Sequence, residues 1–379
     1  MKRLLRPTGL LLLLVCEAGF GQGVPAPSPP GMPQVPQVPQ MPQSPQVPQI
    51  PQMPRPGAPG MPGTAPGMPP RAGFPPSAMP GVVAPTVPAR SREFPLPAPT
   101  TQGKLALGVD GNIYVALTDA NRIARLDPRT GAFQQWPLPG VARPRGLTLD
   151  RQGVIWYAGT ATVGRLNPVT GQVRDYPLPA GPPTEEITSD PRNMIWFTRP
   201  DANLVGRLDP DSGLVKEMPV PARPRSIIAD RAGNIWLTLA AQDKMLVFNT
   251  NSDAWRDVQL PSGLQPSDIA LGPDGTLLWL TGNGARTALG YDTAAGRVYR
   301  EYQSPIGGGG IGLVASDGRG LIWLVNSASN TLVRMDTRTG TSQPLSLSNP
   351  SPGIQDILID QAGRLWYLAI GNSRLGVVE

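Results

Sequence analysis

The chain has 379 residues, a formal net charge of +6, a single cysteine and no histidine. The excess positive charge lies almost entirely before residue 91 (+5), and the remainder is nearly neutral (+1). A nearly neutral body argues against a surface that follows a phosphate backbone, so we expect no nucleic-acid partner. The missing histidine removes the commonest general base and transition-metal ligand, and one cysteine excludes a disulfide within the chain.

Residues 1–21 have the pattern of a secretory signal peptide. Three basic residues precede the apolar run Leu10–Val15, and small residues follow at the expected cleavage site. The run is too short to span a bilayer, so we expect an exported protein, periplasmic or extracellular, without a transmembrane segment. Valine before Cys16 departs from the bacterial lipoprotein box, so we do not expect a lipid anchor there.

Residues 22–91 are about one-third proline and form a separate linker region. From Pro33 to Pro54 proline recurs at every third position, in the pattern P-Q-x. This period matches the three residues per turn of polyproline II, which predicts a semi-rigid spacer of roughly 70 Å. The third edge of that helix is largely apolar, so docking of the strip into an aromatic groove of a protein partner stays open as an alternative.

The rest of the chain, residues 92–379, repeats itself. One aromatic residue returns at steps of 42, 40, 40, 43, 44 and 43 residues: Tyr114, Trp156, Trp196, Trp236, Trp279, Trp323 and Trp366. A period of 40 to 45 residues with strand-like units is typical of a β-propeller. We therefore predict an all-β fold with seven blades, in which the recurring aromatic residues pack between neighbouring blades.

Each repeat contains four short β-runs, and a turn of Asp or Asn, often Pro, and Gly follows the third. The last repeat stops after three runs, at Leu375–Val378. Residues 93–97 precede the first repeat and resemble the fourth β-run of the other repeats. We expect them to supply the missing fourth strand of the last blade. Prolines in these fourth runs suit an outermost strand, which has one unpaired edge.

The sequence motif at Ile195–Gly213 resembles the repeat of the virginiamycin B lyase (streptogramin lyase) family of seven-bladed propellers. It reads I-W-F-T-x-x-x-x-N-x-V-G-R-L-D-P-x-x-G. Weaker copies occur in four other repeats, and the resemblance covers residues 93–379. In that family the lyase opens a cyclic depsipeptide by elimination at an ester, with a histidine general base and a magnesium ion near the central channel. The resemblance implies the fold more strongly than the activity, because blade repeats consist mostly of core and turn residues.

This chain departs from the family pattern at the catalytic positions. It has no histidine, and family blades commonly carry Glu after I-W-F-T. The corresponding positions here hold Leu117, Gly159, Arg199, Leu239, Gly282, Asn326 and Ala369. General-base catalysis contributes roughly 10²–10⁴-fold to a rate, so another group would have to replace the histidine. We therefore predict the fold without the activity and assign no catalytic residue.

Ligands of propellers usually bind at one mouth of the central channel, where loops from all blades converge. The residues that enter the first run of each repeat vary most in chemistry: Gly103-Lys104, Arg145-Gly146, Glu185-Glu186, Arg225-Ser226, Ser267-Asp268, Gly312-Leu313 and Gln355-Asp356. With Arg199 on an adjacent loop, we take as candidate ligand-binding residues Arg145, Glu185, Glu186, Arg199, Arg225, Asp268, Gln355 and Asp356.

Three interpretations of this set stay open. Arginines can hold the carboxylate or phosphate of an anion or peptide. The acidic members can hold Ca²⁺ or Mg²⁺. Alternatively, Arg145–Glu185 and Glu186–Arg225 simply pair across neighbouring blades. The four glycines Gly307–Gly310 follow a strand and predict a flexible loop rather than a phosphate-binding one.

Two functions follow from the sequence. The first is an exported, non-enzymatic binding or scaffold propeller with a protein or peptide partner and no required cofactor. The second is an exported lyase or hydrolase that uses carboxylates and a divalent metal in place of histidine.

Overall fold

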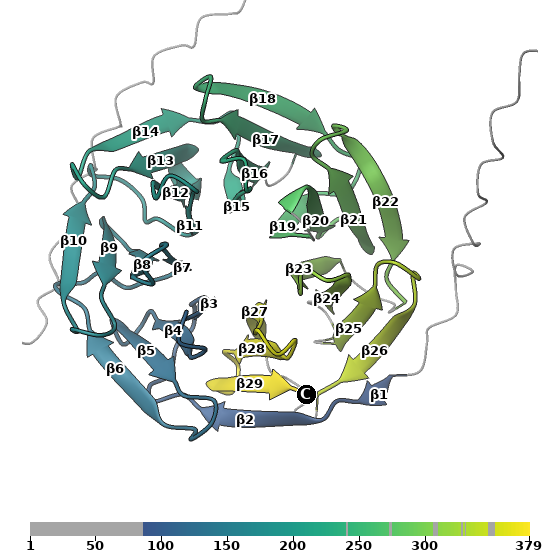
Figure 1. Ribbon diagram of the computed structural model, residues 1–379, viewed down its shortest axis with the longest axis horizontal. Helices are drawn as coiled ribbons and strands as arrows, with labels where there is room; N and C mark the ends of the chain where they lie inside the picture. Colours follow the sequence, from purple (N-terminus) through teal and green to yellow (C-terminus); the bar gives the residue numbers. More distant parts are fainter. Residues whose placement is uncertain are drawn as a thin grey trace, which may run out of the picture. The chain divides into compact units, whose positions relative to one another are not determined.

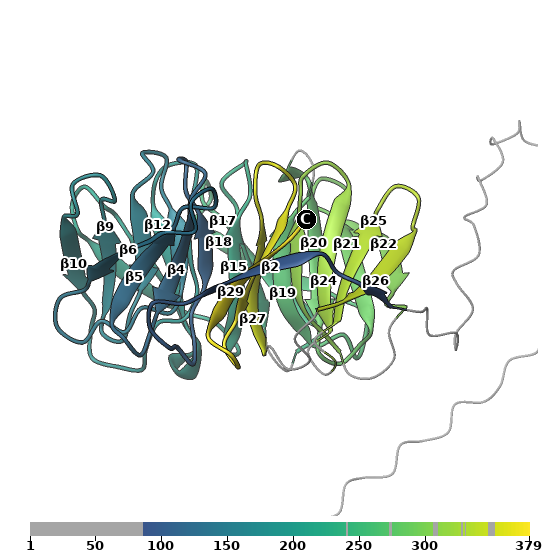
Figure 2. The ribbon, with the colours of Figure 1, turned by 90° about the horizontal axis from the view of Figure 1, so that it is seen from below.

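The computed structural model describes residues 86–239, 242–272, 275–305, 310–326, 329, 331–347 and 353–379. In these residues seven antiparallel sheets surround a central opening, as a seven-bladed propeller (Figures 1 and 2). The predicted all-β fold with seven blades is confirmed. The signal peptide and most of the proline-rich linker lie outside the described residues. The described part of the chain contains no helix with the length and apolar character needed to cross a membrane.

Blades 1 to 3 have short first strands of three residues. Blade 1 consists of β3 (Leu105–Leu107), β4 (Ile113–Leu117), β5 (Arg122–Leu126) and β6 (Phe133–Pro137). Blade 2 consists of β7 (Leu147–Leu149), β8 (Ile155–Ala158), β9 (Thr162–Leu166) and β10 (Val173–Pro177). Blade 3 consists of β11 (Ile187–Ser189), β12 (Ile195–Arg199), the 3-10 turn η1 (Pro200–Ala202), β13 (Leu204–Leu208) and β14 (Val215–Pro219).

Blades 4 to 7 have first strands of six residues. Blade 4 consists of β15 (Pro224–Ala229), β16 (Ile235–Leu239), β17 (Lys244–Asn249) and β18 (Ala254–Gln259). Blade 5 consists of β19 (Pro266–Leu271), β20 (Leu277–Gly282), β21 (Thr287–Asp292) and β22 (Arg297–Gln303). Blade 6 consists of β23 (Ile311–Ser316), β24 (Leu321–Asn326), β25 (Thr331–Asp336) and β26 (Ser342–Ser346). Blade 7 contains β27 (Ile354–Ile359), β28 (Leu365–Ala369) and β29 (Arg374–Val378).

The leading segment closes the ring, as predicted. Strand β2 (Ser91–Pro95) pairs antiparallel with β29 along its whole length, from Ser91 opposite Val378 to Pro95 opposite Arg374. It is the outermost strand of blade 7 (Figure 1). The sequence did not predict a second contact: β1 (Val87–Pro88) pairs parallel with β26 and adds a fifth strand to blade 6. The same segment therefore covers the outer edges of two neighbouring blades.

The hydrophobic core is divided among the blade interfaces. Seven clusters of buried residues each join two neighbouring blades; one of them packs Trp366 and Leu375 of blade 7 against Ile113 and Leu126 of blade 1. The recurring aromatic residues are at most 5% exposed, which confirms their role in the core. The predicted turns also form: the N–H of Gly131 donates to the carbonyl of Asp127, and this glycine has a φ of 76°.

An aspartate fixes the recurring tryptophan in four blades. In blade 3 the buried Asp190 accepts hydrogen bonds from the backbone N–H groups of Arg192 and Met194 and, at 3.0 Å, from the indole N–H of Trp196. The same bond to the residue six positions later occurs at Asp150, Asp230 and Asp360. Each of these carboxylates therefore ties the turn after a first strand to the core residue of the second.

Candidate functional site

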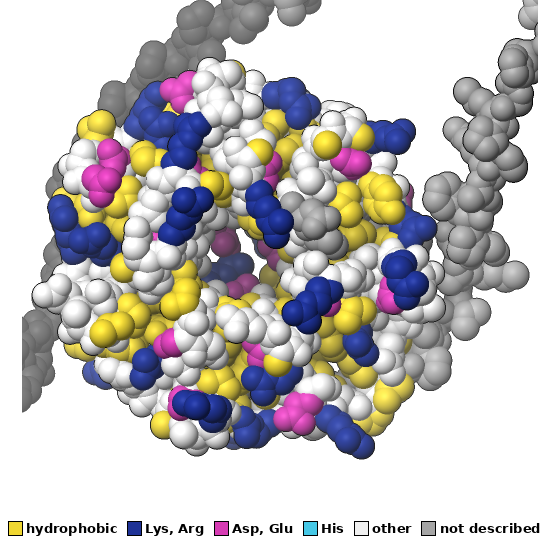
Figure 3. Space-filling model, in the orientation of Figure 1, with side chains coloured by type: hydrophobic (Ala, Val, Ile, Leu, Met, Phe, Trp, Pro, Cys, Tyr) yellow, Lys and Arg dark blue, Asp and Glu magenta, His cyan; other side chains and the backbone are white. Residues whose placement is uncertain are grey.

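The loops that lead into the first strands meet the loops between second and third strands on one face. Arg143, before the first strand of blade 2, contacts Asp119 of the β4–β5 loop at 3.1 Å. Arg223, before blade 4, makes the same kind of ion pair with Asp201 between β12 and β13. Both loop types therefore share one mouth of the channel, as the sequence predicts. Figure 3 shows acidic and basic side chains inside the opening.

Lys104 lies at the centre of the charged cluster in the channel. Its ammonium contacts Glu186 Oε1 of blade 3 at 3.1 Å and Asp356 Oδ1 of blade 7 at 3.2 Å. Its side chain is 19% exposed, and those of its partners are 24% and 11% exposed. The other oxygen of Asp356 accepts a hydrogen bond from the N–H of Leu105 at 2.7 Å. One lysine thus joins three blades, and Gly146, which has no side chain, stands at the matching position of the blade between.

Asp268 joins the next blades in the same way. It accepts hydrogen bonds from the Ser226 hydroxyl of blade 4 and from the N–H of Val314 of blade 6, both at 3.0 Å. The first strands of blades 4 to 7 each carry a register shift at this end, in blade 5 between Pro266 and Asp268. A bulge leaves one residue outside the regular pairing and redirects its side chain. The bulges therefore place Asp268 and Asp356 at the channel.

Burial and the surplus of carboxylates set the protonation of the cluster. Burial raises the pKa of Glu186 to about 7, with a contribution from the nearby Asp356 and Asp268 that the attraction of Lys104 does not offset. Burial also raises the pKa of Asp356. Burial opposes the charge of Lys104, but its carboxylate neighbours raise its pKa well above the ordinary value. One ammonium faces three carboxyl groups, and the pKa of Glu186 lies close to neutral pH.

The rim of the mouth carries the arginines that the sequence indicated. Arg145 pairs with Glu185 at 3.3 Å, as expected, and Glu185 also lies 3.7 Å from Arg223. The expected pair between Glu186 and Arg225 does not form, because Glu186 contacts Lys104 instead. Arg225 is exposed at the start of β15. The structure thus combines a paired cluster inside the channel with arginines around its mouth.

Arg199 lies apart from this cluster. It is 1% exposed; its Nε donates to the carbonyl of Pro182, and one terminal nitrogen donates to the carbonyl of Pro179 and to Glu217 at 2.7 Å. Gly181 leaves room for the guanidinium, since a Cβ there would approach it to 2.4 Å. Arg199 therefore anchors the connector from blade 2 to blade 3, which continues into Glu185 and Glu186. It positions the site without lining it.

The remaining candidates are placed as follows. Gln355 is half-buried beside Asp356, on the bulge of β27. Of the predicted glycine loop, residues 307–309 lie outside the described residues, so that prediction stays untested. No group of three acidic, histidine or cysteine side chains in the described ranges is placed to hold a metal ion. The channel carboxylates instead contact an ammonium, a serine hydroxyl and backbone N–H groups.

Two features of the site were not selected from the sequence. Lys104 stood in the aligned set of mouth positions but was not chosen, because its partners are up to 252 residues away in the chain. The threonine of the I-W-F-T motif also contributes. Thr198 Oγ1 accepts from the N–H of Glu186 at 3.1 Å, and Thr238 does the same for Ser226 at 3.0 Å. This recurring threonine fixes the backbone at the channel entrance.

Comparison with known proteins agrees with this fold. Residues 162–379 match the model of the virginiamycin B lyase family. A streptogramin B lyase structure is 24% identical with a TM-score of 0.69, over 76% of this chain and 97% of that one. A virginiamycin B lyase from Staphylococcus aureus is 20% identical with a TM-score of 0.68, over 76% and 99%. A catalytically inactive histidine-to-alanine variant of virginiamycin B lyase from the same organism, with quinupristin, is also 20% identical, with a TM-score of 0.68 over 76% and 98%.

A search of curated proteins gave no match. The identities to the solved structures support the shared fold alone, whereas the family model covers more than half of the chain. With seven blades of the same repeat around the channel, this chain belongs to the virginiamycin B lyase family.

Proposed function

We propose that this protein is an exported, non-enzymatic binding propeller that holds a peptide or protein partner at the mouth of its channel. The observation that carries this proposal is the absence of histidine from all 379 residues. A related virginiamycin B lyase is described as catalytically inactive once one histidine is replaced by alanine. A chain without histidine lacks the general base of that kind of chemistry.

The arginines of the mouth determine the kind of partner. Arg225 is exposed, Arg145 pairs with Glu185, and Arg223 pairs with both Glu185 and Asp201. Arginine presents a rigid fork of donors that matches a carboxylate, and exposed ion pairs are weak enough to exchange for a ligand. The partner that fits best is a peptide or protein segment with acidic side chains. The channel interior is less suited to an anion, because Lys104 is already surrounded by carboxylates.

Export and presentation on a spacer rest on the N-terminal sequence. The proposed signal peptide, residues 1–21, would deliver the protein to the periplasm or the outside of the cell. The proposed proline-rich linker, residues 22–91, would hold the propeller away from its point of attachment or dock to a partner itself. Small-angle scattering of residues 22–379 tests the spacer, which requires an extended tail beside a compact disc.

Affinity capture tests the binding function. The mature protein and the propeller alone serve as parallel baits, each with a variant in which Arg145 and Arg225 are replaced by glutamate. Partners held by the mouth should bind both wild-type baits and be lost from the variants. Partners that remain on the variants would contradict the assignment to the mouth. Turnover of a cyclic depsipeptide by the purified protein would contradict a non-enzymatic role.

One observation favours a lyase or hydrolase as the second candidate. Glu186 lies in the channel and has a pKa raised to about 7, which suits a general base. A divalent metal would then have to displace Lys104 from the carboxylates. Calorimetry with Mg²⁺ or Ca²⁺ and thermal melts with a chelator separate the two functions. Tight binding that is lost in the double variant Glu186→Gln and Asp268→Asn favours the enzyme, and no binding favours the binding module.

A further inference from the structure

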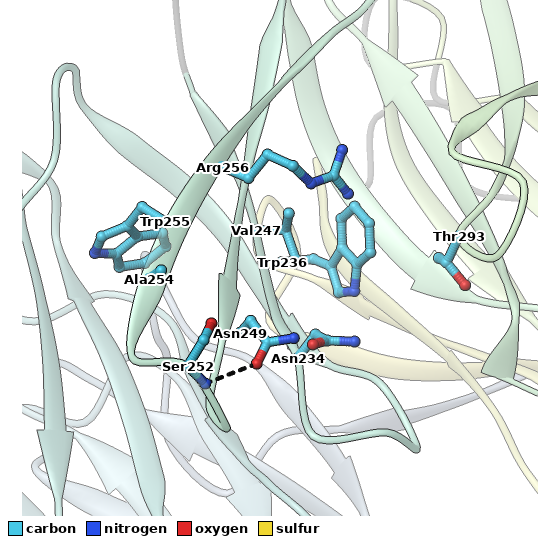
Figure 4. Close-up of a pocket in the computed structure, with 9 residues that line it drawn as sticks. All are labelled: Asn234, Trp236, Val247, Asn249, Ser252, Ala254, Trp255, Arg256 and Thr293. Atoms are coloured by element: carbon cyan, nitrogen blue, oxygen red, sulfur yellow. Dashed lines mark hydrogen bonds between the residues drawn. The ribbon is translucent and has the colours of Figure 1, made fainter.

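A cavity of about 380 Å³ lies between blades 4 and 5, away from the channel mouth. Its lining includes Asn234, Trp236, Val247, Asn249, Arg256 and Thr293. Figure 4 shows the Arg256 guanidinium beside the Trp236 ring, with the two asparagines below them and Thr293 on the opposite side. The volume is at the lower end of the range for small-molecule sites, so it suits a ligand the size of one sugar ring.

The cavity lies where blade 4 differs from blade 2 beside the recurring tryptophan. In blade 2 the cross-strand neighbour of Trp156 is Arg165, which lies over the indole at 6.0 Å, and Tyr176 stacks on the same ring at 5.5 Å. In blade 4 the position of that arginine is held by Val247, and the position of the tyrosine by Val258. Two small side chains thus replace two large ones. Tyr291 of blade 5 packs on the Trp236 ring instead, with the ring centroids 5.8 Å apart, and the remaining space lies outside these buried residues, beside Arg256 and Asn249.

Arg256 lacks a contact that two of its counterparts make. In blade 7 Arg92 donates to the carbonyl of Pro128 at 2.6 Å, and in blade 5 Arg300 donates to that of Thr337 at 2.9 Å. Both carbonyls belong to the turn after the third strand of the next blade. The equivalent residue for Arg256 is Thr293, across the cavity. Within the described part of the chain, no acceptor contacts the Arg256 guanidinium.

The polar groups of the lining are arranged for a neutral or anionic ligand. The Asn249 side-chain oxygen accepts from two backbone N–H groups, which leaves its NH₂ free. The Asn234 NH₂ donates to Asp230, which leaves its oxygen free. No carboxylate lines the cavity, and Arg256 is its one charged group. Trp236 and Val247, which are 1% and 5% exposed, close the cavity at its inner end.

We propose that this cavity binds a small acidic sugar, of the hexuronate class. The carboxylate pairs with Arg256, since arginine forms charge-assisted bonds with carboxylates. The hydroxyls bond to the free groups of Asn249 and Asn234. This site is independent of the channel and does not rest on the proposed function.

Titration calorimetry of the full chain with glucuronate tests the proposal, with glucose and acetate as separate ligands. We expect glucuronate to bind with a dissociation constant in the millimolar range. Glucose, which has no carboxylate, and acetate, which has no hydroxyl groups, should each bind about tenfold more weakly. Arg256→Gln should weaken glucuronate binding about tenfold. Val247→Arg introduces the arginine that stands opposite the recurring aromatic residue in blades 1, 2, 3 and 6, and it should fill the cavity and abolish binding. Arg151→Gln, an exposed arginine in blade 2, is the matched control and should bind like the wild type.

Three outcomes would overturn the proposal. Glucuronate gives no binding heat, acetate binds as tightly as glucuronate, or Arg256→Gln binds glucuronate unchanged. Circular dichroism establishes that Val247→Arg is folded. If it is not, Arg256→Gln alone decides, because that side chain is exposed and its replacement leaves the core intact.

Discussion

Replacing Glu186 by glutamine removes the one channel carboxyl whose pKa is raised to about 7. The glutamine carbonyl still accepts a hydrogen bond from Lys104, but the side chain can no longer ionise. In the unfolded chain the same carboxyl has its ordinary pKa of 4.5. Between these two values the folded state binds the proton more tightly than the unfolded state does. The stability from this group is therefore complete below pH 4.5 and is lost as the pH rises through about 7.

The size of the effect follows from the difference between the two pKa values. Linkage gives a loss of about 2 kcal/mol from Glu186 between about pH 5 and about pH 8. The glutamine variant has no such loss. Its unfolding free energy should therefore rise relative to that of the wild type by about 2 kcal/mol across this range. Asp356 stays in both proteins, so its own titration largely cancels in the comparison.

Urea unfolding followed by tryptophan fluorescence at several pH values measures this difference. The matched control is Glu185→Gln on the neighbouring residue, which pairs with Arg145 at the rim and does not contact Lys104. We expect the control to change with pH in parallel with the wild type. A Glu186→Gln profile that also runs parallel to the wild type would refute a protonated carboxyl in the channel.

Three further changes test the scaffold. Asp190→Ala leaves two backbone donors and an indole N–H without an acceptor and should lower the unfolding free energy by about 3 kcal/mol, whereas Asp209→Ala, in an exposed turn, should cost less than about 1 kcal/mol. Arg199→Met removes the buried cation beside Glu217 and should cost about 3–5 kcal/mol in denaturant unfolding, with faster proteolysis of the blade 2 to blade 3 connector. A chain that begins at Ser91 lacks β1 and should melt within a few degrees of the full chain. A chain that begins after β2 should lose its cooperative thermal transition. Equal melting temperatures of the two shortened chains would contradict closure of the ring by β2.

The fold was predictable because it repeats. A core residue that returns every 40 to 44 positions fixes the number of blades, and the missing fourth run of the last repeat requires a strand from elsewhere, which Phe94 and its neighbours supply. The Asp–Trp bond was also present in the sequence as a six-residue spacing, but was not recognised. Strand β1 was not predictable, because two residues carry no periodicity and its pairing with β26 depends on the three-dimensional course of the chain.

For the candidate site, the sequence predicted only the face of the propeller on which it lies. Alignment of the first runs identified which residues enter the channel, and Glu186, Asp268 and Asp356 lie there. The partners were not predictable, because Lys104 reaches across the channel to blade 3, which is not a neighbour of blade 1, as well as to the adjacent blade 7. Arg199 was misplaced for a related reason: it occupies a family position near the mouth, but its guanidinium turns into the connector, where three oxygens accept from it.

Departures from the repeat do not all have the same meaning, and blade 5 shows why. Position 272 is glycine where five other blades carry an aspartate, and the Trp279 indole N–H has no acceptor among the described residues. The expected consequence of this loss is a less stable blade. In blade 4 an open space instead lies beside Arg256, which lacks the contact that Arg92 and Arg300 make. A departure indicates a binding site only where room and unpaired polar groups coincide, and blade 4 meets both conditions.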